Sequence, residues 1–360
     1  MEAGASNIQP ADTVVLYPTY GSWDAEGLCW RVPIAGSVFQ PRPEGLRQRL
    51  LLRVLRRVLQ AQHSDLEGPL FQERIGGFLT VGERGRRIAL TVGDRVELLP
   101  ASSRANGHFR ACLVLSQDKI ERLQRQGAIS DGWLPLRVVM PEGHGRRFDG
   151  RVQLIDPSGL SVISDIDDTM KQTDVAHRRV LLRNIFLRPF RVVPGMPEAY
   201  RSLARRGVAF HYVSSSPWQL FECLRELLDQ TGFPWGSFHL RNVRFRVPGL
   251  LRLLVSHGSG KRRAITSILA AFPQRRFLLV GDSGERDPEI YGAVARRFPR
   301  QVAGILIRDV PGRELDGQRQ QRAFRGLAPG LWRVFRDGHE LADQLTAASD
   351  LDGGGGDQQP

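Results

Sequence analysis

The stretch GLSVISDIDDT, residues 159–169, decides the fold of the C-terminal half of this chain. An apolar run ends at Ser164, and the carboxylates of Asp165, Asp167 and Asp168 follow it at once. A short continuous apolar run predicts a strand buried on both faces, as in a parallel sheet covered by helices. Ligands bind such sheets beyond the carboxyl ends of the strands. The acidic residues that follow the run are therefore candidate site residues.

Further apolar runs alternate with helical patterns toward the C-terminus. The runs are VAFHYVS, RFLLVGD and VAGILIR, and helices are predicted around 196–206, 217–230, 261–271 and 288–298. This alternation predicts an α/β domain of three layers over residues 159–338, with a mostly parallel sheet of five strands. One run leads into Ser214, and another leads into Asp282, with Asp287 five residues further on.

Carboxylates that meet at one edge of a sheet repel one another unless they share a cation. Oxygen ligands without a nearby His or Cys pair favour a hard divalent ion, and we expect Mg²⁺. Lys261 opens a predicted helix and could offer a compact positive charge to a phosphoryl oxygen. The alternatives are solvated turn residues at Asp165 and Asp167, and a helix cap at Ser214.

The motifs resemble those of a known superfamily. DIDDT after a strand, a strand-ending Ser, a Lys that opens a later helix, and GDSGERD resemble the four motifs of the haloacid dehalogenase superfamily of phosphotransferases. More narrowly, SDIDDT, YVSSSPWQL and FPQRRFLLVGDSGERDPEIY resemble the catalytic domain of the actin-patch-associated phosphatidate phosphatase family, over roughly residues 150–310. The resemblance implies a magnesium-dependent phosphatase that acts on phosphatidate or a related lipid phosphate.

The resemblance also implies a role for each acidic residue. Asp165 would be the nucleophile that forms an aspartyl-phosphate, and Asp167 would be the acid and base. Mg²⁺ would be held by Asp165, by the backbone carbonyl of Asp167 and by Asp282. Asp287 would orient these metal ligands from behind.

Ser214 and Lys261 would bind the transferring phosphoryl oxygens. The intervals from Asp165 to Ser214 and from Ser214 to Lys261 are too short to hold an independent cap domain beside the core elements. We therefore expect a capless domain with an open site. A basic surface around that site would suit an anionic lipid headgroup, and its candidate arginines are Arg241, Arg244, Arg246, Arg252, Arg262 and Arg263.

Other functions stay open at this point. A phosphatase with the same machinery could act on a soluble or nucleic-acid phosphomonoester instead of a lipid. A receiver-like switch also combines Asp, Ser or Thr, and Lys around Mg²⁺, but its acids sit on different strands from those of this chain. A domain that binds without catalysis is a further alternative, although every catalytic position is filled.

Residues 1–158 predict a smaller β-rich domain. Apolar runs such as TVVLYP, RVPIAGSVF, RRIALTV and WLPLRVVM are separated by turn residues, which indicates an antiparallel sheet unit. Between residues 43 and 62 the apolar positions recur at helical spacing, with arginines off the stripe. This basic amphipathic helix could pack on its own domain or contact a membrane surface.

The 360-residue chain carries a net charge of +13, which favours phosphate-bearing partners. Residues 339–360 contain five carboxylates, no Lys or Arg, and a GGGG run, so we expect a flexible acidic tail. Cys29, Cys112 and Cys223 are far apart and fit reduced thiols. Without an apolar span or a basic leader, we expect a cytoplasmic protein with at most peripheral membrane contact. Protein partners are not indicated.

Overall fold

The computed structural model describes residues 4–41, 46–173, 178–242 and 259–352. The chain forms two compact units, which are described separately. Unit 1 runs to Ser158 and is also assigned β14 (Ser237–Arg241). Unit 2 contains the other described residues from Gly159 onward.

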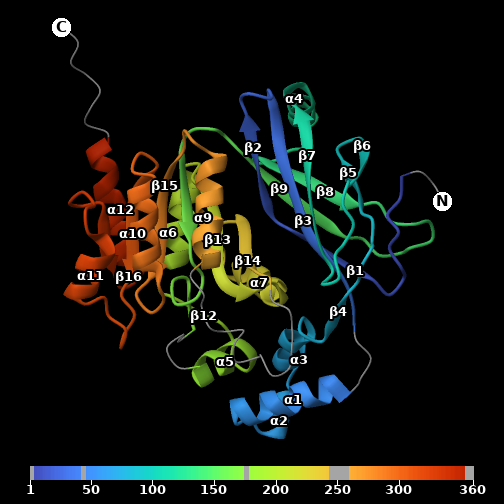
Figure 1. Cartoon of the computed structure of the whole chain (residues 1–360), viewed down its shortest axis with the longest axis horizontal. Coiled ribbons are helices and arrows are strands. Elements are labelled where there is room, and N and C mark those ends of the chain that lie inside the picture. Colours follow the sequence, from blue (N-terminus) through green and yellow to red (C-terminus); the bar gives the residue numbers. More distant parts are fainter. Residues whose placement is uncertain (1–3, 42–45, 174–177, 243–258, 353–360) are drawn as a thin grey trace. The chain divides into compact units, whose positions relative to one another are not determined.

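Unit 1 is built on a nine-stranded sheet whose strand pairs are mostly antiparallel (Figure 1). The predicted antiparallel character has one exception, because β2 and β9 pair in parallel. Side chains along β8 alternate between buried and exposed, so one face of the sheet packs on a core that includes Val32, Ile34 and Phe109. The strands are β1 (Thr13–Tyr17), β2 (Thr19–Asp24), β3 (Cys29–Pro41), β4 (Thr80–Gly82), β5 (Ala89–Val92), β6 (Arg95–Leu98), β7 (His108–Ser116), β8 (Trp133–Val138) and β9 (Asp149–Ile155).

The basic helix predicted near 43–62 is α1 (Leu46–Leu59), and residues 42–45 lie outside the described part. Leu55 and Leu59 have no exposed surface, whereas Arg53 and Arg56 are exposed. These two leucines of the apolar stripe are therefore covered by protein, which favours packing on the domain over a membrane contact for them. The other helices of unit 1 are α2 (His63–Glu67), α3 (Pro69–Gly76) and α4 (Gln117–Arg125).

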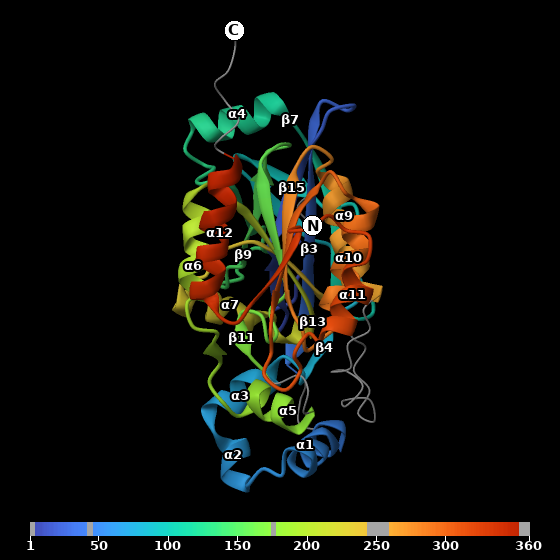
Figure 2. The same cartoon turned by 90° about the vertical axis from the view of Figure 1, so that its left-hand side faces the viewer.

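Unit 2 has the predicted three layers. Its sheet has six strands in the order β14, β13, β10, β15, β16, β17, one more than predicted, and the strands from β13 to β17 pair in parallel. Figure 2 shows α6 and α12 on one side of this sheet and α9, α10 and α11 on the other. The strands are β10 (Leu160–Ser164), β13 (Ala209–Pro217), β15 (Arg276–Asp282), β16 (Val302–Arg308) and β17 (Trp332–Phe335), and the helices are α6 (Met196–Arg205), α9 (Ser259–Ala271), α10 (Asp287–Arg297), α11 (Gly317–Phe324) and α12 (Gly338–Asp352).

Small elements fill the intervals between the central strands. They are β11 (Lys171–Gln172), α5 (Arg178–Phe186), β12 (Arg191–Val192), η1 (Trp218–Leu220) and α7 (Phe221–Thr231). Within the described residues these elements belong to unit 2 and form no separate compact unit. None of the described helices combines the length and the apolar composition that a bilayer span requires.

The C-terminal segment is more ordered than its composition predicts. Residues 339–352 belong to α12 instead of a flexible tail, and residues 353–360 lie outside the described part. Asp337 Oδ1 accepts hydrogen bonds from the backbone N–H groups of His339 and Glu340, which caps the helix. Leu341 is fully buried. A cap and an apolar anchor thus outweigh the acidic character that suggested disorder.

Candidate active site

Asp165 lies directly beyond the carboxyl end of β10, a central strand of the parallel sheet. Its backbone N–H donates to the carbonyl of Val280 on β15 at 2.9 Å, which extends the strand pairing by one residue. The side chain is 1% exposed, and its Oδ2 accepts a hydrogen bond from the Thr169 hydroxyl at 3.3 Å. The residue predicted as nucleophile is therefore fixed at the edge of the sheet where parallel folds bind ligands.

Asp282 and Asp287 reach the same place from the neighbouring strand. Asp282 ends β15, and Asp287 begins α10. The Asp282 backbone N–H donates to Asp287 Oδ2 at 3.3 Å. A side chain at Gly281 would overlap the Asp287 carboxylate and the Tyr291 ring, so only glycine allows this close approach.

One ammonium lies among the carboxylates at this edge of the sheet and contacts three of them. Lys261 Nζ on α9 lies 2.8 Å from Asp165 Oδ1, 2.6 Å from Asp287 Oδ1 and 3.3 Å from Glu285 Oε2. We call this group the acidic cluster, and its members are Asp165, Lys261, Asp282, Glu285 and Asp287. It sets four carboxylates against a single lysine, and all these side chains are nearly inaccessible to solvent. The cluster is therefore short of positive charge.

Burial changes the proton affinities of the acidic cluster. It raises the pKa of Asp165, Asp282 and Glu285, because a buried carboxylate is poorly solvated and its anionic neighbours repel it. Burial opposes the charge of Lys261, but the carboxylates around it raise its pKa above the ordinary value. The protein alone thus leaves these carboxylates with unfavourable charges.

The acidic cluster fits a hard divalent cation. One carboxylate oxygen each from Asp165, Asp282 and Asp287 lie within 4.8 Å of one another. Two buried oxygens, Asp165 Oδ1 and Asp282 Oδ2, accept no hydrogen bond, although the first has the charge contact with Lys261. Oxygen donors of this kind are what Mg²⁺ requires. Asp287, predicted to stand behind the metal ligands, thus lies within reach of the same cation as the other two.

The Asp167 side chain points into a different set of partners. Its Oδ1 accepts from Lys171 Nζ at 2.5 Å and from the Thr173 hydroxyl at 3.1 Å. Its Oδ2 accepts from the hydroxyls of Ser214 at 3.0 Å and Ser216 at 2.7 Å. We call these five residues the Asp167 cluster. The carboxylate of Asp167 does not belong to the group of three that fits a cation.

The Asp167 cluster stabilises a negative charge. Burial by itself would raise the pKa of Asp167. The Lys171 ammonium outweighs burial, and together with the hydroxyl donors it lowers the pKa to about 2. In the resting site Asp167 is therefore a carboxylate at neutral pH.

Sequence reasoning assigned Ser214 to the phosphate and did not assign Lys171, Thr173 or Ser216 to the site. Ser214 does not cap a helix, because its Oγ accepts from the Ser216 backbone N–H and donates to Asp167. The sequence could have indicated Lys171 as a site residue, because it is one of three lysines among 51 basic residues and lies four residues after Asp167. Glu285 was visible in GDSGERD but had no role in the predicted chemistry.

The arginines predicted around the site are described only in part. Arg262 and Arg263 on α9 are exposed and follow Lys261 directly, so they present positive charge to solvent beside the acidic cluster. Arg241 is partly buried on β14, in unit 1. Arg244, Arg246 and Arg252 lie outside the described residues. Of the six predicted arginines, Arg262 and Arg263 are therefore the ones that the described part of unit 2 contains.

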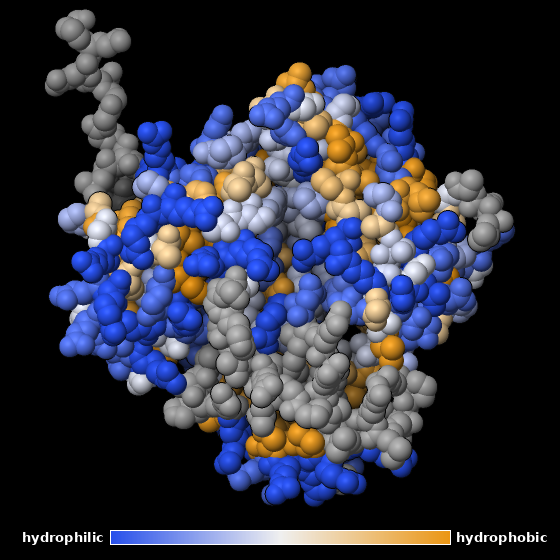
Figure 3. Space-filling view, in the orientation of Figure 1, coloured by the Kyte–Doolittle hydropathy of each residue, from blue (hydrophilic) through white to orange (hydrophobic). Residues whose placement is uncertain are grey.

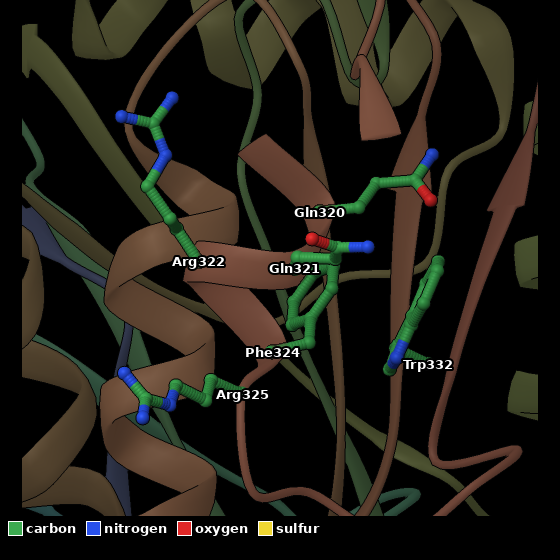
Figure 4. Close-up of a pocket in the computed structure, with 6 residues that line it drawn as sticks. All are labelled: Gln320, Gln321, Arg322, Phe324, Arg325 and Trp332. Carbon is green, nitrogen blue, oxygen red and sulfur yellow. The ribbon is translucent and has the colours of Figure 1, made fainter. Parts of the chain in front are cut away.

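A separate pocket of about 560 Å³ opens on the same unit, at α11 and β17. Figure 4 shows its residues, with the Trp332 ring standing beside the Gln320 and Gln321 side chains. Trp332 stacks on Phe324 with ring centres 4.7 Å apart. None of the lining residues belongs to the acidic cluster or the Asp167 cluster. In the view of Figure 3 the surface on the side of α10, α11 and α12 is mainly hydrophilic, with some hydrophobic residues among them.

Comparison with known sequences confirms the resemblance to the phosphatidate phosphatase catalytic domain that the motifs indicated. Residues 160–309 match the family described as Phosphatidate phosphatase APP1, catalytic domain. Phosphatidate phosphatase APP1 of Saccharomyces cerevisiae is 39% identical over 158 residues, which are 43% of this chain and 26% of the yeast protein. An uncharacterized protein of Schizosaccharomyces pombe is 31% identical over 170 residues, which are 46% of this chain and 27% of that protein. The match spans about a quarter of the length of these relatives.

Two solved structures are also similar to part of the chain. A putative beta-phosphoglucomutase from Thermotoga maritima is 13% identical, with a TM-score of 0.32, over 52% of this chain and 98% of that one. The D,D-heptose 1.7-bisphosphate phosphatase of B. bronchiseptica is 16% identical, with a TM-score of 0.21, over 52% of this chain and 98% of that one.

Proposed function

We propose that unit 2 is a magnesium-dependent phosphatase that hydrolyses a phosphomonoester through an aspartyl-phosphate, with phosphatidate or a related lipid phosphate as substrate. The observation that carries the proposal is the meeting of Asp165, Asp282 and Asp287 within reach of one cation at the carboxyl edge of a parallel sheet. The family match over residues 160–309 supports the lipid phosphate as substrate.

Bound Mg²⁺ would supply positive charge that lets a carboxylate approach a phosphate, and Asp165, Asp282 and Asp287 would hold it. Asp165 then attacks phosphorus in line with the departing oxygen. Lys261 has its ammonium against Asp165 and Asp287, where it can offset charge on the transferring oxygens. Ser214 can turn its hydroxyl from Asp167 to a phosphoryl oxygen.

Asp167 handles the proton in this scheme. It is ionised in the resting site, and an incoming phosphate dianion raises its proton affinity because the two charges repel. It therefore takes up a proton as the substrate binds and gives it to the leaving oxygen. Once deprotonated again, it activates the water that hydrolyses the aspartyl-phosphate.

The experiment compares three substrates on purified full chain with Mg²⁺: phosphatidate in detergent micelles, glycerol 3-phosphate, and a 5′-phosphorylated oligonucleotide. We expect phosphate release from phosphatidate above the other two. Asp165→Asn should reduce that release by at least about 10⁴-fold, since it removes the nucleophile. Asp118→Asn, an exposed position on α4 in unit 1, is the matched control and should keep full activity.

Each outcome decides a different part of the proposal. Release from the oligonucleotide alone would overturn the lipid substrate and keep the phosphatase. No release from any of the three by folded protein, or full activity in Asp165→Asn, would overturn the phosphatase itself. Colorimetric phosphate release measures all of these, with circular dichroism as the folding control.

A further inference from the structure

Lys171 is a buried cation that the chemistry so far has not used. Its side chain is 2% exposed, and its ammonium contacts Asp167 Oδ1 and the Thr173 hydroxyl, the latter at 2.9 Å. The Phe190 ring lies 4.8 Å from the ammonium and covers it on another side. Burying an ammonium costs its hydration free energy unless an oppositely charged partner compensates. Here that partner is Asp167, the residue proposed to move the proton.

The backbone holds Lys171 firmly against Asp167. Asp168 adopts a left-handed conformation with φ of 55°, and its N–H donates to the Lys171 carbonyl at 2.8 Å. The chain therefore turns back so that Lys171 forms a β-bridge with Asp167. Lys171 then continues into β11, which pairs with β12 at Val192. The ammonium is thus carried by a paired backbone instead of a free loop.

The two oxygens of Asp167 have unequal partners. Oδ1 is bound by an ammonium and by the Thr173 hydroxyl that this ammonium also contacts. Oδ2 is bound by two serine hydroxyls, and one of them belongs to Ser214, the predicted phosphate ligand. Charged hydrogen bonds are stronger than neutral ones, and hydroxyl groups rotate freely to other acceptors. Oδ1 is therefore the oxygen held by a charged partner, and Oδ2 is the oxygen whose hydrogen-bond partners can change.

We propose that Lys171 is a positioning residue that, together with Thr173, anchors Asp167 Oδ1 so that Oδ2 is the oxygen that carries the proton. This assignment rests on the proposed phosphatase function. Lys171 touches neither the substrate nor the reacting atoms. It acts by holding the Asp167 carboxylate in one orientation through both chemical steps.

The two steps fix what the orientation must serve. In the first, a bond forms between an Asp165 oxygen and phosphorus, the bond from phosphorus to the leaving oxygen breaks, and that oxygen takes the proton from Asp167 Oδ2. In the second, a water proton passes to Oδ2, the water oxygen bonds to phosphorus, and the Asp165 oxygen is released. The products are an alcohol and inorganic phosphate, and Asp165 regains its free carboxylate.

The test uses Lys171→Met, which keeps the length of the side chain and removes the charge. With p-nitrophenyl phosphate the leaving group departs without a proton, so the first step does not need Asp167, whereas hydrolysis of the aspartyl-phosphate does. We expect a burst of nitrophenolate, close to one per active site, followed by steady turnover about 100-fold slower than in the unmodified protein. With glycerol 3-phosphate or phosphatidate, kcat should fall at least as far, while KM stays within about threefold of its original value.

Lys119→Met is the matched control, because Lys119 forms a partly buried ion pair with Glu97 in unit 1 and should leave both phases unchanged. If Lys171→Met does not fold, Thr173→Val removes the neutral anchor alone and should give the same burst with a smaller loss. Equal losses in the burst and in steady turnover, or no loss in the folded variant, would overturn the inference. Failure of the unmodified protein to release phosphate would instead overturn the proposed function.

Discussion

The acidic cluster and the Asp167 cluster each contain one of two aspartates that follow β10, yet their charges are balanced in opposite ways. In the first, one ammonium contacts three of the four carboxylates, and two carboxylate oxygens accept no hydrogen bond. In the second, one carboxylate faces one ammonium and three hydroxyls, and both of its oxygens are bound. The acidic cluster therefore needs positive charge from outside the chain, whereas the Asp167 carboxylate already has a partner for each of its oxygens.

This difference explains how two aspartates, two residues apart, can do different chemistry. Burial raises the pKa of Asp165, and the ion pair with Lys171 lowers the pKa of Asp167. A cation at the acidic cluster would make Asp165 an available anion without changing the partners of Asp167. The environment, more than the residue type, separates the nucleophile from the proton carrier.

Replacing one carboxylate oxygen of the proposed cation site should have the strongest effect on activity. Asp282→Asn should reduce activity by roughly 10²-fold or more, because the cation loses a charged ligand. In the unmodified protein, Mg²⁺ at about 100 times its Kd should stabilise the folded state by about 2.7 kcal/mol. We expect that thermal stabilisation to be nearly absent in Asp282→Asn and retained in Lys171→Met. Equal Mg²⁺ stabilisation in the three proteins would contradict a metal site at the acidic cluster.

The sequence predicts the acidic cluster better than the Asp167 cluster, and the reason lies in chain geometry. Asp165 and Asp282 follow parallel strands, and such strands end at one edge, so their meeting can be predicted from apolar runs alone. The contacts of Asp167 depend on a left-handed turn at Asp168 and on a return of the chain to Lys171. No periodic pattern encodes a single turn of that kind.

The same contrast holds for the fold. In unit 2 the four central strands could be predicted because their buried runs are continuous, whereas the edge strand β17 was not among the predicted runs. The helices found at Met196–Arg205 and Asp287–Arg297 start and end close to the predicted positions. In unit 1 the runs predicted strands but not their partners, and the parallel pairing of β2 with β9 was missed. Pairing between distant strands depends on tertiary packing, which short windows of sequence do not contain.

The two clusters should give the folded state opposite dependences on pH. Carboxylates with a raised pKa bind protons more tightly in the folded state, so Asp165, Asp282 and Glu285 stabilise the fold at low pH and lose that contribution as the pH rises above about 4. Asp167 behaves in the opposite way, because its pKa is lowered to about 2, and its contribution is lost only as the pH falls from about 4 to 2.

Urea unfolding between pH 4 and 8 measures the contribution of the carboxylates with a raised pKa. Each of them can lower the free energy of unfolding by up to about 1.4 kcal/mol per pH unit as the pH rises. With a chelator, the free energy of unfolding should fall with rising pH more steeply in the unmodified protein than in Asp282→Asn. With saturating Mg²⁺, the slope of the unmodified protein should flatten, since the cation binds the ionised carboxylates. Identical slopes for both proteins in the chelator would contradict the charge deficit of the acidic cluster.

A weaker loss of activity should follow when Asp167 Oδ2 loses one of its two hydroxyl donors. Ser216→Ala removes one of the two hydroxyls on Oδ2 and leaves Ser214, Lys171 and Thr173 in place, so the carboxylate stays anchored. Loss of one such hydrogen bond corresponds to about 1 kcal/mol, and kcat should fall about fivefold with KM nearly unchanged. Steady-state kinetics on phosphatidate measures it, with Thr266→Ala, at a partly buried hydroxyl elsewhere on α9, as control. A loss as large as that of Lys171→Met would mean that both oxygens of Asp167 are anchored alike, and the contrast between Oδ1 and Oδ2 would be wrong.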